Sequence, residues 1–173
     1  MTLPLGAVLA GGQSRRFGSD KAMALLEGRP LIEHAIGSLI PFTERVIVIG
    51  REDGMPDCPR GGHGPLAGIN AAIHYALRFD YDAVLTTGCD VPVLPKGLGE
   101  LLAGGGYIAE MPIVGLWPTA LALHLDTWLK GDSDRSVRGW ADAAGLKRVE
   151  LGAPVVNFNT PGDLDAFTRG PGG

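Results

Sequence analysis

Short apolar runs alternate with amphipathic stretches along the first half of the chain. Buried strands are predicted at residues 5–9, at residues 45–50 and within 82–90, where apolar and β-branched residues gather. Helices are predicted at residues 28–40 and 64–78 from the helical spacing of their apolar positions. Strands that alternate with helices in this way predict an α/β protein with a mostly parallel sheet and helices on both faces.

The second half of the chain has a less regular pattern. It predicts helices at 119–131, 136–145 and 160–170, the last with Thr160 as N-cap and Pro161 in its first turn, and a weaker helix at 95–104. Short strands are predicted at 147–151 and 154–158, with one or two more between 108 and 116, broken at Pro112. No repeat or long linker divides the chain, so we expect one domain over residues 1–170 and a flexible tail at 171–173.

Composition narrows the function classes. The 173 residues, 45% hydrophobic and 20% charged, are typical of a globular domain. The formal net charge of −4 argues against a nucleic-acid partner, and no apolar run is long enough to suggest a membrane span. Cys58 and Cys89 form no disulfide framework, and a reducing cytoplasm is the simplest setting for them.

Three polar segments follow predicted strands, namely residues 10–21, 88–92 and 157–161. In open α/β sheets, ligands bind outside the carboxyl ends of the strands. We therefore expect these segments to meet on one rim of the sheet.

The first of these segments, AGGQSRRFGSDK, is neither a Walker A loop nor a G-x-G-x-x-G loop. Gly11 and Gly12 would let backbone N–H groups approach a phosphate, and Arg15, Arg16 and Lys21 could surround a triphosphate. The alternative is a glycine-rich turn with solvated cations. The position after the first strand favours phosphate binding.

Asp90 lies at the end of the third predicted strand. Such a carboxylate is either a turn acceptor, which Pro92 would suit, or a ligand for Mg²⁺, which commonly uses one or two carboxylates plus substrate phosphates. On this residue alone the two readings are balanced. Opposite a cationic phosphate loop, the metal is favoured.

Several other positions allow two interpretations, one functional and one structural. Gly64 and Gly68 could let a flat base lie against the backbone or could simply open a helix, and Asn70 could read a base or face solvent. Asn157 and Asn159 alternate on a predicted strand and could hold a metal-bound phosphate or ribose, or could form a turn.

Two arginines further along the chain could serve a second substrate. Arg135 and Arg138 could reach an anionic group, or lie on a solvated helix face. The four histidines are dispersed, so no catalytic triad can be argued, and Cys89 is better explained as a small core residue than as a nucleophile.

Taken together, LAGGQSRRFGSDK, GRPLIEHAI, GPLAGI, GCDVPVLP and NFNTPGDL resemble, in this order, the molybdenum cofactor guanylyltransferases. The resemblance spans nearly the whole chain and implies a single-domain, Rossmann-like, three-layer nucleotidyltransferase fold. The N-terminal half would bind the nucleotide and the C-terminal half the pterin. The implied reaction joins GMP from GTP to the phosphate of molybdenum-loaded molybdopterin with Mg²⁺ and releases pyrophosphate.

The resemblance also implies roles for individual residues. Leu9, Ala10 and Gly11 would hold the nucleotide by their backbone, and Gly12, Arg16 and Lys21 would contact its phosphates. Asp57, Gly64, Pro65, Leu66 and Asn70 would also lie on the nucleotide side. Asp90 would ligate Mg²⁺, with Asn157 and Asn159 near the metal and phosphates. Arg16, Lys21 and Asp90 would be the catalytic residues.

No general base is required in this reaction, because a phosphate monoester is already anionic at neutral pH. Phe17, where the family more often has Met, and Trp117, in the compact pterin half, depart from the family pattern. Two alternatives remain: a cytidylyl or sugar-phosphate nucleotidyltransferase, and a non-catalytic escort that carries the cofactor. The resemblance leaves room for transient contacts with molybdenum-insertion and acceptor enzymes.

Overall fold

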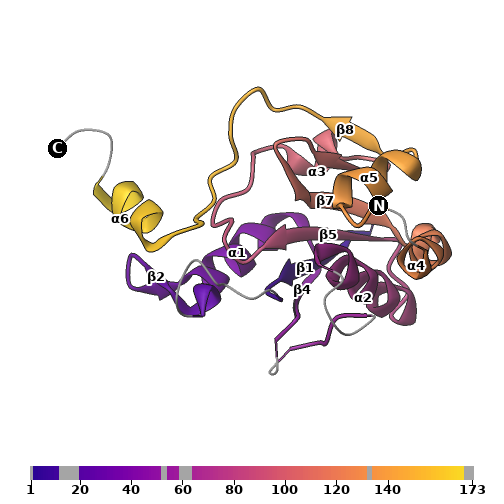
Figure 1. The fold of residues 1–173 in the computed structure, drawn as a ribbon, viewed down its shortest axis with the longest axis horizontal. Coiled ribbons are helices and arrows are strands. Elements are labelled where there is room, and N and C mark those ends of the chain that lie inside the picture. The colour runs from indigo at the N-terminus through magenta and orange to yellow at the C-terminus, as the bar shows by residue number, and fades with distance from the viewer. Residues whose placement is uncertain (1, 12–19, 52–53, 59–63, 132–133, 170–173) are drawn as a thin grey trace.

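A six-stranded sheet with strand order β4-β1-β5-β7-β6-β8 forms the centre of the molecule (Figure 1). The computed structural model describes residues 2–11, 20–51, 54–58, 64–131 and 134–169. The strands of this sheet are β1 (Leu5–Leu9), β4 (Arg45–Ile49), β5 (Ala83–Gly88), β6 (Gly106–Ile108), β7 (Met111–Pro118) and β8 (Lys147–Val149). A second, two-stranded sheet pairs β2 (Leu25–Leu26) with β3 (Arg29–Pro30).

Helices connect most of these strands. They are α1 (Leu31–Leu39), α2 (Pro65–Arg78), α3 (Leu98–Leu101), α4 (Ala122–Lys130), α5 (Val137–Ala143) and α6 (Pro161–Arg169). Three short 3₁₀ helices are η1 (Lys21–Met23), η2 (Ile40–Phe42) and η3 (Thr119–Leu121).

All strands of the central sheet except β7 run in one direction. β1 pairs in parallel with β4 and with β5, and β6 pairs in parallel with β8. β7 is antiparallel to both of its neighbours, β5 and β6. The mostly parallel sheet is therefore as predicted, and the carboxyl ends of β1, β4 and β5 share one edge.

Helices cover both faces of the sheet and bury two separate apolar clusters. Side chains of α2, α4 and α5 pack on one face, and those of α1 and α3 pack on the other. Successive residues of β1 divide between them, since Ala7 belongs to the first cluster and Val8 to the second. The first cluster also holds Trp117 and Trp140, whose ring centroids are 5.4 Å apart. This confirms the predicted three-layer arrangement.

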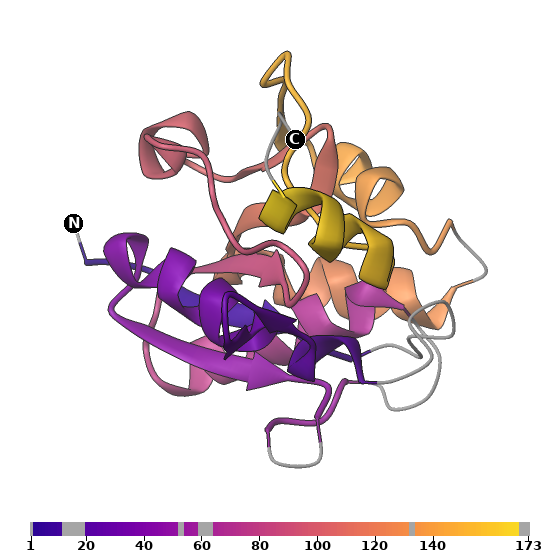
Figure 2. The same ribbon diagram turned by 90° about the vertical axis from the view of Figure 1, so that its left-hand side faces the viewer.

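The C-terminal helix α6 lies at one end of the molecule, beside β2, and Figure 2 shows it in front of the N-terminal segments. A third, small cluster contains Leu26, Leu31, Phe158 and Leu164. The N-cap prediction is confirmed, because the Asp163 N–H donates to Thr160 Oγ1 at 3.2 Å.

Two predicted details of the second half are wrong. Residues 154–158 form no strand; they run as an irregular segment past the end of β5, where Phe158 N–H donates to Asp90 C=O at 3.1 Å. The strand break does not fall at Pro112, which lies inside β7; a turn at residues 109–110 separates β6 from β7. Proline is accommodated there because the β6–β7 register shifts and the β5 pairing begins only at Gly115.

The weaker helix predicted at 95–104 is a single turn, α3, and the one predicted at 119–131 begins as η3 before continuing as α4.

Among the described residues, no helix combines the length and the apolar character that crossing a membrane would need.

Candidate active site

A lysine and an aspartate meet at the carboxyl ends of β1 and β5. Lys21 Nζ lies 2.8 Å from Asp90 Oδ2, although the two residues are 69 positions apart. Their side chains are 15% and 21% exposed, so both charges are largely shielded but remain open to solvent. The strand-end rule thus correctly brings Lys21 and Asp90 to one place.

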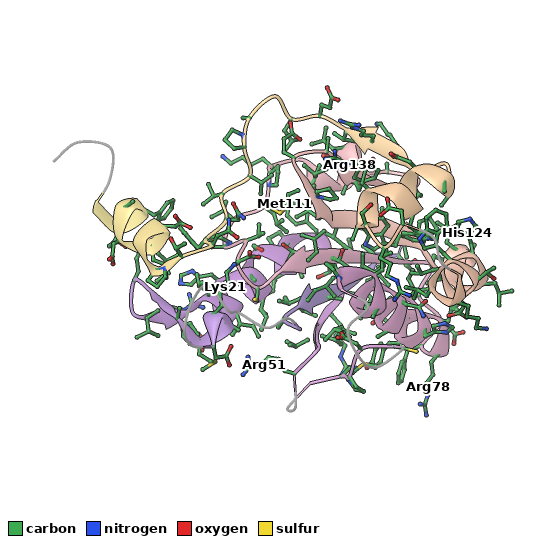
Figure 3. All side chains as sticks on the ribbon, viewed as in Figure 1. Lys21, Arg51, Arg78, Met111, His124 and Arg138 are labelled. Carbon is green, nitrogen blue, oxygen red and sulfur yellow. The ribbon has the colours of Figure 1, made fainter. Side chains whose placement is uncertain are left out.

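Lys21 is held by the start of η1. Asp20 is the N-cap of this turn, and its Oδ1 accepts the Ala22 N–H at 3.1 Å. The Asp20 carboxylate also accepts hydrogen bonds from Arg51 Nη1, at 3.1 Å to Oδ1 and 2.8 Å to Oδ2. Figure 3 labels Lys21 and Arg51 on this side of the molecule. Sequence reasoning missed Arg51, although its position two residues after β4 places it at the same strand ends.

Asp90 sits in a turn that is fastened on two sides. Cys89 N–H donates to Leu9 C=O at 3.2 Å, and Phe158 N–H donates to Asp90 C=O at 3.1 Å. Gly88 gives the Asp90 carboxylate room to fold back, because a Cβ at position 88 would lie 2.4 Å from Asp90 Oδ1. The turn therefore depends on β1, on the C-terminal segment and on a glycine.

The thiol beside this acid is not suited to nucleophilic attack. Burial, reinforced by the Asp90 charge, raises the pKa of Cys89 to about 11. The thiolate is the reactive form, and very little of it exists at neutral pH. The interpretation of Cys89 as a packing residue agrees with its contacts in the second apolar cluster.

Asp57 lies among three glycines. A Cβ on Gly11, Gly50 or Gly68 would come within 3.1, 3.3 or 3.5 Å of an Asp57 carboxylate oxygen. These glycines belong to the segment after β1, the segment after β4 and helix α2, so three elements converge on one acid. Gly50 and Gly11 approach so closely that a Cβ on Gly50 would lie 2.4 Å from Gly11 Cα.

The Asp57 carboxylate has no polar partner among the residues that the structure describes. Burial raises its pKa, and within the described part of the chain neither a hydrogen bond nor an ion pair to it is found. Such a group is a strong hydrogen-bond acceptor for a ligand that brings N–H donors.

The start of α2 is formed as its sequence predicts. Gly64, with φ 63°, precedes Pro65 at the first helical position, and Leu66 is fully buried. Asn70 does not face solvent, because it is 1% exposed and its Nδ2 donates to Cys58 C=O at 3.2 Å and to Asp126 Oδ1 at 2.9 Å. Nothing in the sequence pattern pointed to this network.

The two asparagines near the C-terminus are placed differently from the prediction. They do not alternate on a strand, because the segment that holds them forms none. Asn157 is partly buried, and Asn159 is exposed and donates its backbone N–H to Asp163 Oδ2 at 2.7 Å. Asn157 borders an open hollow of about 350 Å³. The other residues that line this hollow are Glu110, Met111, Gly152, Ala153, Pro154 and Val155.

The two arginines assigned to a second substrate lie just before and within α5. Arg138 Nη2 donates to Ala109 C=O at 2.7 Å, and Figure 3 places Arg138 on the α5 side, away from Lys21. Arg135 is exposed. The predicted contacts of Gly12, Arg15 and Arg16 fall outside the described residues.

A magnesium ion fits the chemistry of this rim. In the described ranges, no three or more His, Cys, Asp or Glu side chains are grouped as a metal site. Asp90 offers one hard oxygen ligand that is partly open to solvent. Mg²⁺ is commonly held in this way, by one or two carboxylates completed by substrate phosphates and water.

Solved structures with the same fold include nucleotidyltransferases. Molybdopterin-guanine dinucleotide biosynthesis protein A from Archaeoglobus fulgidus superposes with a TM-score of 0.68 at 23% identity, over 93% of this chain and 95% of that one. The 2-C-methyl-D-erythritol 4-phosphate cytidylyltransferase from Thermus thermophilus gives 0.69 at 18% identity, over 98% of each chain. At these identities the likeness concerns the fold.

Sequence comparison is more specific. Residues 6–142 match the MobA-like NTP transferase domain. The molybdenum cofactor guanylyltransferase of Rhizobium leguminosarum bv. trifolii (strain WSM2304) is 37% identical, over 95% of this chain and 91% of its own length. That of Acidiphilium cryptum (strain JF-5) is 33% identical, over 94% and 93%. The chain therefore belongs to the MobA-like NTP transferases and, within them, to the molybdenum cofactor guanylyltransferase family.

Proposed function

We propose that this enzyme transfers GMP from GTP to the terminal phosphate of molybdenum-loaded molybdopterin and releases pyrophosphate. The observation that carries the proposal is the 2.8 Å pair of Lys21 Nζ and Asp90 Oδ2 at the strand ends. A nucleotidyltransferase needs a cation for phosphate and a carboxylate for a divalent ion in one place, and this pair supplies both. The family of the chain supports the same reaction.

The chemistry places few demands on the protein. The attacking phosphate is already an anion, so the protein has to align the two substrates and balance charge rather than remove a proton. Lys21 would hold a phosphate oxygen and stabilise the departing pyrophosphate, with Arg16 as a second cation. When bound, Mg²⁺ would be held by Asp90 and would neutralise phosphate charge.

We place the guanine ring beside Asp57. Guanine presents N1–H and the 2-amino group on one edge, and a carboxylate can accept both hydrogen bonds. Cytosine and adenine do not present this pair of donors. The Asp57 carboxylate has no polar partner among the described residues and lies against Gly11, on the expected nucleotide side, which supports this assignment. Leu9, Ala10 and Gly64 to Leu66 would complete the nucleotide side.

We place molybdopterin on the side of the hollow that Asn157 borders. This residue directly precedes Phe158, whose N–H donates to Asp90 C=O, so the hollow begins next to the acid. Asn159 would serve the same substrate. Arg138 donates to Ala109 C=O, next to the lining residues Glu110 and Met111, and would lie on the same side. We expect the reaction to take place in the cytoplasm, which the free thiols of Cys58 and Cys89 suit, with transient contacts to acceptor enzymes.

The test is a product assay with single triphosphates. The protein, Mg²⁺ and molybdenum-loaded molybdopterin are incubated with GTP, CTP or ATP, and the dinucleotide is detected by mass alongside pyrophosphate. We expect product with GTP. Product with CTP alone would identify a cytidylyltransferase, and GTP binding without pyrophosphate release would identify an escort protein.

Two variants test the site itself. Asp90→Ala and Lys21→Ala should each reduce turnover by about 10²–10³-fold or more while circular dichroism shows the fold intact. Lys96→Ala, which removes an exposed lysine, is the matched control and should keep the parent rate. Parent-like turnover by a folded Asp90→Ala protein would overturn the assignment.

A further inference from the structure

A polar network centred on the buried Asn70 connects helices α2 and α4, which pack against each other (Figure 1). Asn70 of α2 is 1% exposed, and its Nδ2 donates to Asp126 Oδ1 of α4 at 2.9 Å. The same Nδ2 donates to Cys58 C=O at 3.2 Å. His74 Nε2, one turn further along α2, lies 3.0 Å from Asp126 Oδ1.

The network fixes the backbone next to Asp57. Cys58 N–H, which belongs to the peptide attached to the Asp57 Cα, donates to Ala67 C=O of α2 at 3.2 Å. Asn70 holds the C=O of the same Cys58. Both backbone groups of Cys58 are therefore tied to one helix, whereas the Asp57 side chain has no partner of its own within the described residues.

Asp126 decides which way the Asn70 amide points. Burial is the largest single influence on its pKa and acts to raise it, but the hydrogen bonds from His74 and Asn70 together lower the pKa. The ionised carboxylate can only accept, so it must face the NH₂ group of Asn70 rather than the amide oxygen. The second hydrogen of that NH₂ group is then available for Cys58 C=O.

The Asn70 amide oxygen, in contrast, is buried without a hydrogen-bond partner among the described residues. An amide that leaves one acceptor unsatisfied is a poor choice for packing alone, since an apolar side chain of similar size would avoid that cost. The arrangement is explained if the two Asn70 donors have a task outside the core.

We propose that Asp126 is a positioning residue for nucleotide selection, acting through Asn70 and Cys58 to hold Asp57 toward the base. The inference rests on the proposed function, because it concerns the selectivity of that same site. It assigns a role in base selection to a residue of α4, in the half of the chain expected to bind the pterin, and Asp126 itself touches no substrate.

The experiment measures KM and kcat for GTP, and the kcat/KM ratio of GTP to ATP, in four proteins. These are the parent, Asp126→Leu, Asp126→Asn and the control Thr127→Ala, whose hydroxyl donates to Leu123 C=O on the same helix. We expect Asp126→Leu to raise KM for GTP about tenfold and to reduce the preference for GTP by a similar factor, with a much smaller change in kcat. Asp126→Asn keeps an acceptor oxygen and should recover most of the selectivity.

Thermal melts accompany the kinetics. A merely structural Asp126 would lower Tm in Asp126→Leu but leave the GTP preference unchanged, and that result overturns the inference. If Asp126→Leu does not fold, Asp126→Ser, which removes the carboxylate with less bulk, decides by the same readout. A parent protein that makes no dinucleotide from any triphosphate refutes the proposed function instead, so the two failures are distinguishable.

Discussion

The same substitution, threonine to valine, should affect stability differently at two adjacent positions of β5. Thr86 and Thr87 are both fully buried. The Thr86 hydroxyl accepts Trp117 Nε1–H at 2.7 Å and donates to Ile113 C=O at 2.6 Å. The Thr87 hydroxyl is buried without a hydrogen-bond partner among the described residues. The same Thr→Val change therefore removes two hydrogen bonds at one position and none at the next.

The size of the effect follows from what each change leaves behind. Valine keeps the shape of threonine, but Thr86→Val leaves the Trp117 N–H buried and unpaired at a cost of about 1–3 kcal/mol. For a chain of this length, 1 kcal/mol shifts Tm by about 2–4 °C, so Tm should fall by about 2–12 °C. Thr87→Val removes an unsatisfied buried hydroxyl, and its Tm should stay the same or rise.

Tm is measured by calorimetry, and the free energy of unfolding and the m-value by urea titration, for both variants and the parent without nucleotide. An unchanged m-value shows that the comparison concerns stability and not a change in the unfolded state. If Thr87→Val loses as much stability as Thr86→Val, the hydroxyl of Thr87 has a partner that the structure does not show. If neither variant changes Tm, the Trp117–Thr86–Ile113 chain of hydrogen bonds contributes nothing, and the reasoning is wrong.

Three further predictions concern single residues. Gly88→Ala should displace the Asp90 carboxylate and remove most of the transferase activity. The control Gly99→Ala, where an added Cβ meets nothing within 4 Å, should keep the parent activity. Equal activity of the two variants would contradict the proposed need for space beside Asp90. Asp57→Asn should raise Tm at neutral pH, because burial raises the pKa of Asp57 and its ionised form weakens the fold above that pKa. The Tm difference from the parent should close as pH falls and the parent carboxyl takes up its proton; melts across acidic pH check this, and a constant difference would refute it. Gly37→Ala, in α1 and with open space around it, should add about 1 kcal/mol and raise Tm by about 2–4 °C, and a decrease would show a contact that the geometry lacks.

The features that follow from local chemistry could be predicted from the sequence. The apolar run of β1 and the helical spacing of α2 indicated both elements, and the strand-end rule brought Lys21 to Asp90 across 69 positions. Pro161 and Thr160 marked the start of α6 because capping is encoded within a few residues.

Features that depend on tertiary context were not predictable. Residues 154–158 have the composition of a strand, but they pair with no strand of the central sheet, and Phe158 N–H bonds to the Asp90 turn instead. Pro112 was read as a break because the register shift between β6 and β7 that accommodates it is not visible in the sequence. Asn70 meets Asp126 only because α2 and α4 cover the same face of the sheet.

The contact between Phe158 and the Asp90 turn has a consequence for biosynthesis. A ribosome releases β1, β5 and the turn well before residue 158 emerges, so the hydrogen bond from Phe158 N–H to Asp90 C=O is added to the turn late. Phe158 also packs with Leu26 and Leu31, so the same late residue joins early elements to the rim. The nascent chain therefore lacks one of the hydrogen bonds that fasten the Asp90 turn, and one member of the small apolar cluster, until residue 158 has been synthesised.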